Sequence, residues 1–521
     1  GKIIRQYDSQ AVEEAGLLKF DFLGRPNLSI LADAVARVRH RLGIEIDIDR
    51  LPQRDEKTFE MLSRGETLGV FQMASIGMTS YLMKLKPTRI DDLNVMVALY
   101  RPGPMNNIDE YIARKNGSAR ITYLHPKMES YLAKTFGVLV YQDDLLMTAI
   151  EIAGYTWGEV DKFRKAVGKK IPEEMAKQHL IFVEGCQKHT GMNAQMAEKL
   201  WELFEPFQGY GFNKAHAASY GNLSYQTAYM KANFPVDYMA AVLTAAGGDV
   251  DEIAQIVTEC KRIGIKVLPP DVNESNGTFT VVDDAIRFGL YSIKNFGTGV
   301  ADSIIKARED GGALVDITDF LTRVPDKNLN KKSLESLIKG GALDAFGERG
   351  ILLANIELLL TYHREHQKAP TDQGALFAFE GNARASIQLA DSPPATLLER
   401  LTWEKELLGL YVSGHPLDVH KEKLTKQKMT IKQGKGDFPR GVDTVIAGYI
   451  EDARSILTKG GERMLFIRIA DYTDSIEAVV FPRTLKQTPD LFTPGACVLL
   501  KGRFSERNGD TSFVVEKAKG L

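Results

Sequence analysis

The sequence is short of cysteine and has no long apolar run. Its three cysteines, Cys186, Cys260 and Cys497, are spread over 521 residues. An odd number of widely spaced cysteines argues against a disulfide framework and a zinc module, and it indicates a reducing compartment, which we expect to be the cytoplasm. No apolar run reaches the roughly 18 residues that a membrane-spanning helix requires, and the N-terminus lacks the apolar core of a secretion signal. We therefore expect no membrane partner.

A dominant charge and a phosphate-binding loop are also missing. The 66 lysines and arginines nearly balance the 68 aspartates and glutamates, which leaves a formal net charge of −2. This balance excludes a uniformly basic nucleic-acid binder but allows local basic faces, so the positions of the cations matter more than their total. Because no Gly-x-x-x-x-Gly-Lys-Ser/Thr loop occurs, a helicase or NTPase motor is not expected.

What is present indicates several domains. A length of 521 residues suggests three or four domains of about 150 residues each, and 44% hydrophobic residues are ample for several cores. The first residue is Gly1 rather than methionine, from which we expect a processed product or a fragment. Between residues 25 and 245 apolar residues recur every three or four positions, which predicts a mostly α-helical region. A mixed pattern follows to residue 345, with a hairpin predicted around Asp283-Asp284.

From about residue 437 the sequence changes to strand-like runs. Turn signals separate five such runs, at 445–450, 464–469, 476–481, 497–502 and 512–516. Five short strands in a segment of this size favour a small oligonucleotide-binding (OB) barrel, and a small β-sandwich is the alternative. The expected fold class is therefore a multidomain, mostly α-helical protein with a C-terminal five-stranded OB-type β-barrel.

Asp21 stands inside an apolar run, Leu17-Leu18-Lys19-Phe20-Asp21-Phe22-Leu23-Gly24, that is typical of a buried strand. A carboxylate there is costly unless it is paired, hydrogen-bonded or bound to a metal ion. The functional interpretation is a metal-binding aspartate near a strand end, and a solvated aspartate on an edge strand is the alternative. Metal-dependent phosphoryl transfer normally needs a second carboxylate, because two cations are held about 4 Å apart, and no convincing partner precedes Asp21.

A capping box, Thr156-Trp157-Gly158-Glu159, predicts the start of a helix. The apolar residues of this helix lie on one face, so Arg164 and Lys165 project together from another. Such a pair suits a triphosphate, because arginine supplies forked hydrogen bonds and lysine a point charge. The alternative is a solvated basic face, which the spacing alone favours.

The stretch 207–220 is dense in glycine, aromatic and polar residues, and it contains Asn213, Lys214 and His216. Glycines permit a tight backbone, and aromatic rings are suited to stacking on bases. A packed junction between two helices is the alternative. A second stretch, Arg101-Pro102-Gly103-Pro104, forms a rigid turn that places an arginine after an apolar helix, and by itself it indicates no function.

The stretch 293–300 is typical of the hairpin in a helix-hairpin-helix motif. Gly297 and Gly299 would let backbone amides at the start of the next helix approach a DNA phosphate closely, and Lys294 belongs to the same predicted DNA contact. A second unit at 331–344 is a candidate partner for this hairpin. A plain helical hairpin is the alternative.

Two further patterns lie between residues 360 and 380. In Gln373-Gly374-Ala375-Leu376-Phe377, which follows a polar linker, the glutamine precedes Leu-Phe by three positions and suits insertion into a hydrophobic pocket on another protein. Pentapeptides of this kind are common by chance. His363 and His366 have a spacing that suits a metal ion, but no third ligand lies nearby, so an exposed helix is favoured.

Together and in this order, these motifs resemble the bacterial DNA polymerase III alpha subunit, the family C replicative polymerase. The position of the barrel resembles the alpha type, because the Gram-positive replicative relative carries its barrel near the N-terminus. The resemblance implies the end of a palm at 1–30, fingers at 31–245, a clamp-binding domain with a helix-hairpin-helix at 246–436 and an OB fold at 437–521. The matching stretches span nearly the whole chain: 19–24, 69–72, 98–104, 163–170, 209–220, 403–409 and 413–417.

The resemblance implies a DNA-directed DNA polymerase that uses Mg²⁺ in a two-metal site. Asp21 matches the third palm aspartate, and Lys19 would lie near the triphosphate. Arg164 and Lys165 match the basic pair of the fingers that grips the incoming deoxynucleoside triphosphate (dNTP), and a lysine at 165 should weaken forked contact where the family often has arginine. The block that contains Asn213, Lys214 and His216 would line the same pocket.

The resemblance also implies macromolecular partners. The hairpin with Lys294, Gly297 and Gly299 would hold the duplex backbone of the primer–template, and the barrel would handle the single-stranded template. The residues Gln373, Leu376 and Phe377 match the internal motif that binds the beta sliding clamp. Other subunits of the replicase holoenzyme are further expected partners.

The departures from the family lie before and just after Asp21. The family's N-terminal phosphoesterase-type domain, two palm aspartates and thumb do not precede Lys19, and the usual leucine after Gly24 is Arg25. We therefore expect this chain alone to be inactive as a polymerase. The alternatives are a non-catalytic DNA- and clamp-binding module and an error-prone alpha-subunit relative, which usually has a degraded clamp motif.

Overall fold

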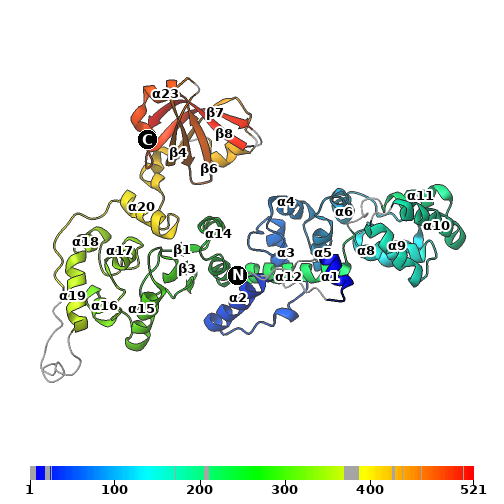
Figure 1. Ribbon diagram of the computed structural model, residues 1–521, viewed down its shortest axis with the longest axis horizontal. Helices are drawn as coiled ribbons and strands as arrows, with labels where there is room; N and C mark the ends of the chain where they lie inside the picture. Colours follow the sequence, from blue (N-terminus) through cyan, green and yellow to red (C-terminus); the bar gives the residue numbers. More distant parts are fainter. Residues whose placement is uncertain are drawn as a thin grey trace. The chain divides into compact units, whose positions relative to one another are not determined.

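The computed structural model describes residues 8–17, 24, 26–169, 172–204, 211–368, 387–424, 429–436, 438–458, 460–507 and 510–521. The chain divides into two compact units, whose elements are labelled in Figure 1. The first comprises Gly1–Ala246 and Thr258–Ile263, and the second comprises Gly247–Val257 and Gly264–Leu521. Helix α14 (Val250–Arg262) therefore begins in the second unit and ends in the first.

The first unit contains helices and turns but no strand among its described residues, as the periodicity predicts. Short 3₁₀ turns connect several of the helices. The helices are α1 (Ser9–Glu14), α2 (Pro26–Leu42), α3 (Glu56–Ser63), α4 (Ile76–Leu85), α5 (Ile90–Leu99), α6 (Ile108–Lys115), α7 (Glu129–Leu132), α8 (Gln142–Glu151), α9 (Trp157–Lys169), α10 (Pro172–Thr190), α11 (Ala194–Glu202), α12 (Lys214–Asn233) and α13 (Pro235–Ala245).

Two apolar cores are found among the described residues of α3 to α12. One gathers α3 to α6 with α12 and includes Leu62, Leu99 and Tyr225. The other gathers α7 to α11 around aromatic rings such as Phe163 and Phe204, which meet edge to face with centroids 5.8 Å apart. Helix α8 packs against α9 in the second core. The amide of its first residue, Gln142, donates to the main-chain oxygen of Phe212, which packs against the first core. Helix α8 therefore connects the two cores.

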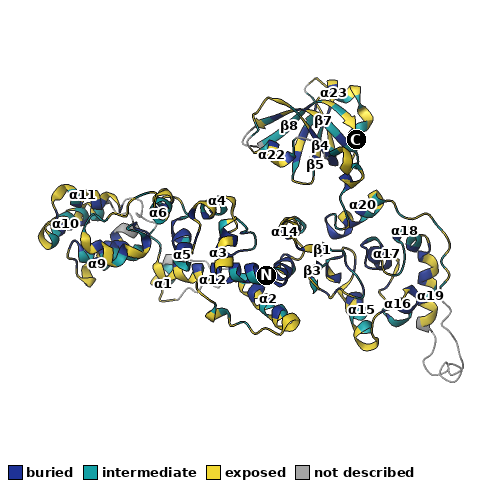
Figure 2. Ribbon diagram, turned by 180° about the vertical axis from the view of Figure 1, so that it is seen from behind, coloured by how far each residue is buried: buried dark blue, intermediate teal, exposed yellow. Residues whose placement is uncertain are grey.

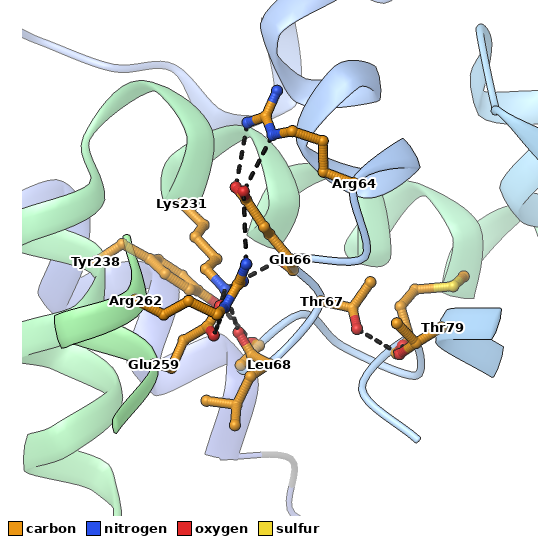
Figure 3. A network of polar contacts seen from close by, with 11 residues as sticks. Arg64, Glu66, Thr67, Leu68, Thr79, Lys231, Tyr238, Glu259 and Arg262 are labelled. Atoms are coloured by element: carbon orange, nitrogen blue, oxygen red, sulfur yellow. Dashed lines mark hydrogen bonds and ion pairs between the residues drawn. The ribbon is translucent and has the colours of Figure 1, made fainter. Parts of the chain in front are cut away.

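A buried polar network ties α12 to the last turn of α14 (Figure 3). The Nζ of Lys231 donates to the main-chain oxygens of Glu66 at 2.9 Å and Leu68 at 2.8 Å, and to Glu259 Oε1 at 2.6 Å. Glu259 also accepts from Arg262 at 2.7 and 2.8 Å, and Arg262 lies 3.6 Å from Glu66. The network holds the Glu66–Leu68 loop directly before the stretch 69–72.

The helices of the second unit come mostly before its barrel (Figure 1). A small sheet of order β1-β3-β2 contains the predicted hairpin, in which Asp283 has φ +51°. The elements before the barrel are β1 (Lys266–Leu268), β2 (Thr280–Val282), β3 (Ala285–Arg287), α15 (Thr298–Gly311), α16 (Ile317–Arg323), α17 (Lys331–Lys339), α18 (Arg349–Ala354), α19 (Ile356–Lys368), α20 (Leu397–Leu408), α21 (Lys421–Leu424) and α22 (Ile431–Lys435).

The barrel is closed and has the strand order β4-β5-β6-β8-β7. Its neighbouring strands are antiparallel except for the parallel pair β6 and β8. This topology confirms the predicted five-stranded barrel, and the sandwich alternative is wrong. The elements are β4 (Asp443–Leu457), β5 (Arg463–Ala470), β6 (Ser475–Val480), α23 (Pro482–Gln487), β7 (Cys497–Arg507) and β8 (Asp510–Gly520).

The matching stretches at 403–409 and 413–417 are held by a buried ion pair. Glu404, which is fully buried, accepts a hydrogen bond from Arg349 at 3.0 Å and from the amides of Val412 and Ser413 at 2.9 Å each. Arg349 also donates to Asp344 at 2.8 Å. Glu404 therefore orients the turn that follows α20 and fastens it to α18.

The histidine pair on α19 differs from the prediction. His363 is buried, with its Nδ1 2.9 Å from the main-chain oxygen of Leu321, and only His366 is exposed. The expectation of an exposed helix is therefore wrong for His363, because α19 packs against α16. Within the described ranges, no three His, Cys, Asp or Glu side chains gather as metal ligands. No helix in those ranges is long and apolar enough to cross a membrane.

Candidate nucleic-acid interface

Helix α9 begins at the predicted capping box. The Thr156 amide donates to Glu159 Oε2 at 2.9 Å, and the Glu159 amide donates to Thr156 Oγ1 at 3.3 Å. Val160 and Phe163 are buried, while the opposite side of α9 is broadly exposed (Figure 2). The sequence thus forms this helix locally and orients its basic residues by periodicity.

Arg164 and Lys165 are exposed on α9 and share one carboxylate. Arg164 Nη2 lies 2.8 Å from Asp161 Oδ1, and Lys165 Nζ lies 2.9 Å from Asp161 Oδ2. Hydrogen bonds from Lys165 and Arg164 lower the pKa of Asp161. Exposed ion pairs of this kind contribute about 0–1 kcal/mol, so a polyanion can replace Asp161 at little cost. Arg164 and Lys165 follow Asp161 by three and four positions, and side chains at this spacing can pair on a helix.

The start of α12 carries three of the predicted residues. Asn213 is the N-cap and accepts a hydrogen bond from the His216 amide at 2.9 Å. The Lys214 amide donates to Asp143 Oδ2 at 3.0 Å, and Lys214 Nζ lies 5.5 Å from the centre of the Tyr141 ring. The positive end of a 20-residue helix thus lies beside a lysine, which favours a negatively charged ligand.

A ladder of contacting groups, with tilted aromatic rings, runs from Arg101 to Phe71. The Arg101 guanidinium lies 4.0 Å from the centre of the Phe212 ring. The Phe212 and His216 rings are 5.2 Å apart, His216 and Tyr220 are 4.2 Å apart, and Tyr220 and Phe71 are 5.2 Å apart. The ladder brings together three stretches of the resemblance: 69–72, 98–104 and 209–220. Sequence reasoning missed Arg101, for which the rigid Pro-Gly-Pro turn was the signal.

The structure does not bring all predicted nucleotide-binding residues into contact. No contact among the described residues joins Arg164 or Lys165 to Asn213, Lys214 or His216. The pair on α9 belongs to the second core, whereas α12 belongs to the first. Two basic positions, one on α9 and one at the start of α12, are therefore available for phosphate groups.

The hairpin before α15 exposes its three predicted DNA-binding residues. Lys294, Gly297 and Gly299 are exposed, whereas Phe296 and Val300 are buried. A Cβ on Gly297 would meet nothing within 4 Å, and on Gly299 only Asp326 Oδ2 at 3.9 Å. The start of α15 is thus open to a phosphate that approaches its amides.

The outer face of the barrel carries an aromatic ring next to a cation. Arg454 on β4, Phe466 on β5 and Val479 on β6 are paired across the strands, so they form one row. The Arg454 Cζ lies 5.7 Å from the centre of the Phe466 ring. OB barrels bind single strands across this part of the sheet, with aromatic rings as stacking platforms.

Five of the predicted site residues lie outside the described residues: Lys19, Asp21, Gln373, Leu376 and Phe377. The metal-binding and clamp-binding assignments therefore stay predictions. The described residues offer no substitute metal site, because no three candidate ligands gather there.

The fold and its exposed cations define a multidomain nucleic-acid-binding protein. Residues 264–350 match the helix-hairpin-helix motif, and residues 444–520 match the OB-fold nucleic acid binding domain. Residues 27–190 match the finger domain of the bacterial DNA polymerase III alpha subunit.

Relatives named DNA polymerase III subunit alpha align with nearly the whole chain. The protein from Thermus aquaticus is 43% identical over 93% of this chain and 40% of its own length. Those from Bacillus subtilis and Pseudomonas aeruginosa are each 38% identical, over 100% and 97% of this chain and 46% of their own lengths. The chain belongs to the bacterial DNA polymerase III alpha-subunit family, and it spans less than half the length of these relatives.

Proposed function

We propose that this chain is the nucleotide- and DNA-binding part of a replicative DNA-directed DNA polymerase. The observation that carries the proposal is the alignment with DNA polymerase III alpha subunits through the finger, helix-hairpin-helix and OB regions in one order. The open hairpin before α15 and the row of Arg454, Phe466 and Val479 on the outer face of the barrel support DNA binding. Both present groups that are suited to contact nucleic acid without reading its sequence.

Arg164 and Lys165 bind the triphosphate of the incoming dNTP in this proposal. A triphosphate carries more charge than Asp161, so it displaces this carboxylate from both cations. The forked arginine orients the phosphates and the lysine adds charge. The start of α12, with Asn213, Lys214 and His216, offers a second group of contacts for the nucleotide, separate in the fold from Arg164 and Lys165.

The cofactor of the proposed reaction is Mg²⁺, with Asp21 as one of its ligands. Bound metal ions would activate the primer 3′-hydroxyl and stabilise the pyrophosphate that leaves. Lys19 would lie near the triphosphate. The steps that the described side chains can carry are the binding and orientation of the nucleotide and of DNA.

The proposed partners are the primer–template DNA, the sliding clamp and other replicase subunits. Lys294, Gly297 and Gly299 would hold the duplex backbone, and the motif Gln373–Phe377 would reach the clamp. The bacterial origin of the relatives supports a cytoplasmic location.

Primer extension by the full-length protein that contains this chain tests the proposal. Arg164→Ala is expected to raise the KM for all four dNTPs by about tenfold or more, because hydrogen bonds to charged groups contribute about 1.5–3 kcal/mol each. Arg120→Ala is the matched control, since Arg120 is an exposed arginine of the same unit. No extension by the full-length protein, or an unchanged KM in Arg164→Ala, would contradict the proposal.

A further inference from the structure

Arg101 has no acceptor for its guanidinium in the part of the chain that the structure describes. Its Cζ lies 4.0 Å from the centre of the Phe212 ring, and its buried Nε donates no hydrogen bond to a described residue. A guanidinium carries five donors and stays charged, so a buried donor without an acceptor is costly to the fold. Such a group is retained in native structures when a ligand supplies the acceptor.

The buried Arg349 and the half-buried Arg308 do have acceptors, whereas the Nε atoms of Arg287 and Arg400, like that of Arg101, donate to no described residue. Arg349 lies 2.8 Å from Asp344 and 3.0 Å from Glu404. Arg308 donates to the main-chain oxygens of Val272 at 3.0 Å and Ser275 at 2.7 Å. Burial lowers the pKa of Arg101 without a neighbouring carboxylate to oppose it. Arg101 therefore lacks the carboxylate and main-chain acceptors that hold Arg349 and Arg308.

The backbone at Arg101 is fixed although its side chain is unpaired. Pro102 restricts the residue before it, and Gly103 has φ +96°, which favours glycine. The main-chain oxygen of Arg101 accepts a hydrogen bond from the Met105 amide at 3.2 Å. The turn and the Phe212 ring thus hold the guanidinium in one place before any ligand arrives.

The groups around Phe212 complete an anion-binding environment. Phe212 directly precedes Asn213, the N-cap of α12, and Lys214. The Asp143 carboxylate accepts a hydrogen bond from the main-chain amide of Lys214. The Lys214 ammonium group lies beside the Tyr141 ring instead. The Arg101 guanidinium therefore lies against Phe212, and Lys214 and the start of α12 follow Phe212 directly in the chain.

We propose that Arg101, held on Phe212, is a phosphate-binding residue that acts together with Lys214. The ligand is a phosphate group, either of the incoming triphosphate or of the template backbone. The inference rests on the proposed function and adds a second phosphate subsite to Arg164 and Lys165, from which it is separate in the fold.

The experiment measures phosphate binding and stability in the same variants. The purified chain is titrated with inorganic tripolyphosphate and, at several salt concentrations, with primed template DNA. The variants are Arg101→Met, which removes the charge at similar length, and Arg101→Lys, which keeps the charge but loses the fork. Arg120→Ala is the matched control and Arg164→Ala is measured alongside.

We expect Arg101→Met to melt at or above the wild-type temperature, because a half-buried guanidinium with an unpaired, buried Nε is replaced by an apolar group. If the ligand is the triphosphate, the same variant binds tripolyphosphate about tenfold more weakly or worse and binds DNA normally. If the ligand is the template backbone, DNA binding weakens and the slope of log K against log salt falls by about one. In either case we expect the affinity of Arg101→Lys for the ligand to lie between the affinities of Arg101→Met and the wild type.

Four results would overturn the inference. The first is binding of both ligands by the Arg101 variants at the level of Arg120→Ala. The second is a large loss of stability in Arg101→Lys, which would reveal a structural role. If Arg164→Ala loses tripolyphosphate binding while the Arg101 variants keep both tripolyphosphate and DNA binding, only the Arg101 inference fails. A wild-type chain that binds neither ligand would overturn the proposed function as well.

Discussion

Removing the carboxylate of Glu259 should leave the buried ammonium group of Lys231 without an anionic partner. Lys231 has a side chain only 1% exposed, and Glu259 is its one acidic partner at 2.6 Å among the described residues. In Glu259→Ala the ammonium keeps only the main-chain oxygens of Glu66 and Leu68. Breaking a buried pair in this way typically costs about 3–5 kcal/mol, since an uncompensated charge remains.

Deprotonation of Lys231 sets a ceiling on this cost. The usual pKa of a lysine is 10.5, so neutralising it at pH 7 costs about 4.8 kcal/mol at 1.36 kcal/mol per pH unit. At pH 8 the ceiling falls to about 3.4 kcal/mol. Arg262 adds little to the cost, because its side chain is 46% exposed and water can replace Glu259.

The sign of the pH dependence follows from proton linkage. In Glu259→Ala the folded state would hold the Lys231 proton less tightly than the unfolded state, so stability rises with pH. In the wild type, burial would raise the pKa of Glu259, but hydrogen bonds from Arg262 and the charge of Lys231 bring it below 4.5. The stability that Glu259 contributes is therefore fully present above its pKa in the unfolded chain, and it is lost as the pH falls through its pKa in the folded protein.

Native-state hydrogen exchange of α12 is the suitable assay, because a chain with two units need not unfold in a single step. The opening free energy of amides near Lys231 is compared between wild type and Glu259→Ala at pH 7 and 8. Glu60→Ala is the control, since Glu60 is exposed and lies 4.0 Å from Arg64. A loss below about 1 kcal/mol, equal to that of the control, would refute the reasoning.

Two further substitutions test the second unit. Glu404→Ala should destabilise the second unit by about 3 kcal/mol or more, because Arg349 and two amides lose a buried acceptor. The control Glu406→Ala, at an exposed position, should not destabilise it. Equal melting temperatures of the two variants would contradict a structural role of Glu404. Phe466→Ala should weaken binding of a single-stranded oligonucleotide by about 1–3 kcal/mol without lowering the melting temperature, and unchanged affinity would exclude Phe466 as a stacking platform.

The barrel could be predicted from sequence because its signals are local. Alternating apolar residues and turn residues lie within each strand and its neighbour. The prediction stopped β4 at residue 450, although the strand continues to Leu457. Beyond Ile450 the strand pairs with β5 outside the apolar interior, so most of its side chains are exposed and the alternation that marks a buried strand is absent.

The candidate site could be predicted only in part. Helical periodicity placed Arg164 and Lys165 on one exposed face, because that arrangement depends on neighbours within two turns. The ladder from Arg101 to Phe71 depends on contacts between residues more than 100 positions apart, as between Arg101 and Phe212. The burial of His363 likewise follows from a main-chain oxygen on another helix, Leu321, which no local pattern reveals.

The buried network and the ladder meet on one loop. Lys231 holds the main-chain oxygens of Glu66 and Leu68, and Tyr238 donates its hydroxyl to the Gly69 oxygen at 2.8 Å. The Phe71 amide donates to Thr227 on α12 at 3.1 Å. The Phe71 end of the ladder is therefore fastened to the middle of α12, while Phe212, which contacts Arg101 at the other end, lies just before the same helix. Because α12 binds Phe71 at its middle and directly follows Phe212 and Asn213, the buried pair that stabilises the helix also fixes the position of its first turn, which carries Lys214.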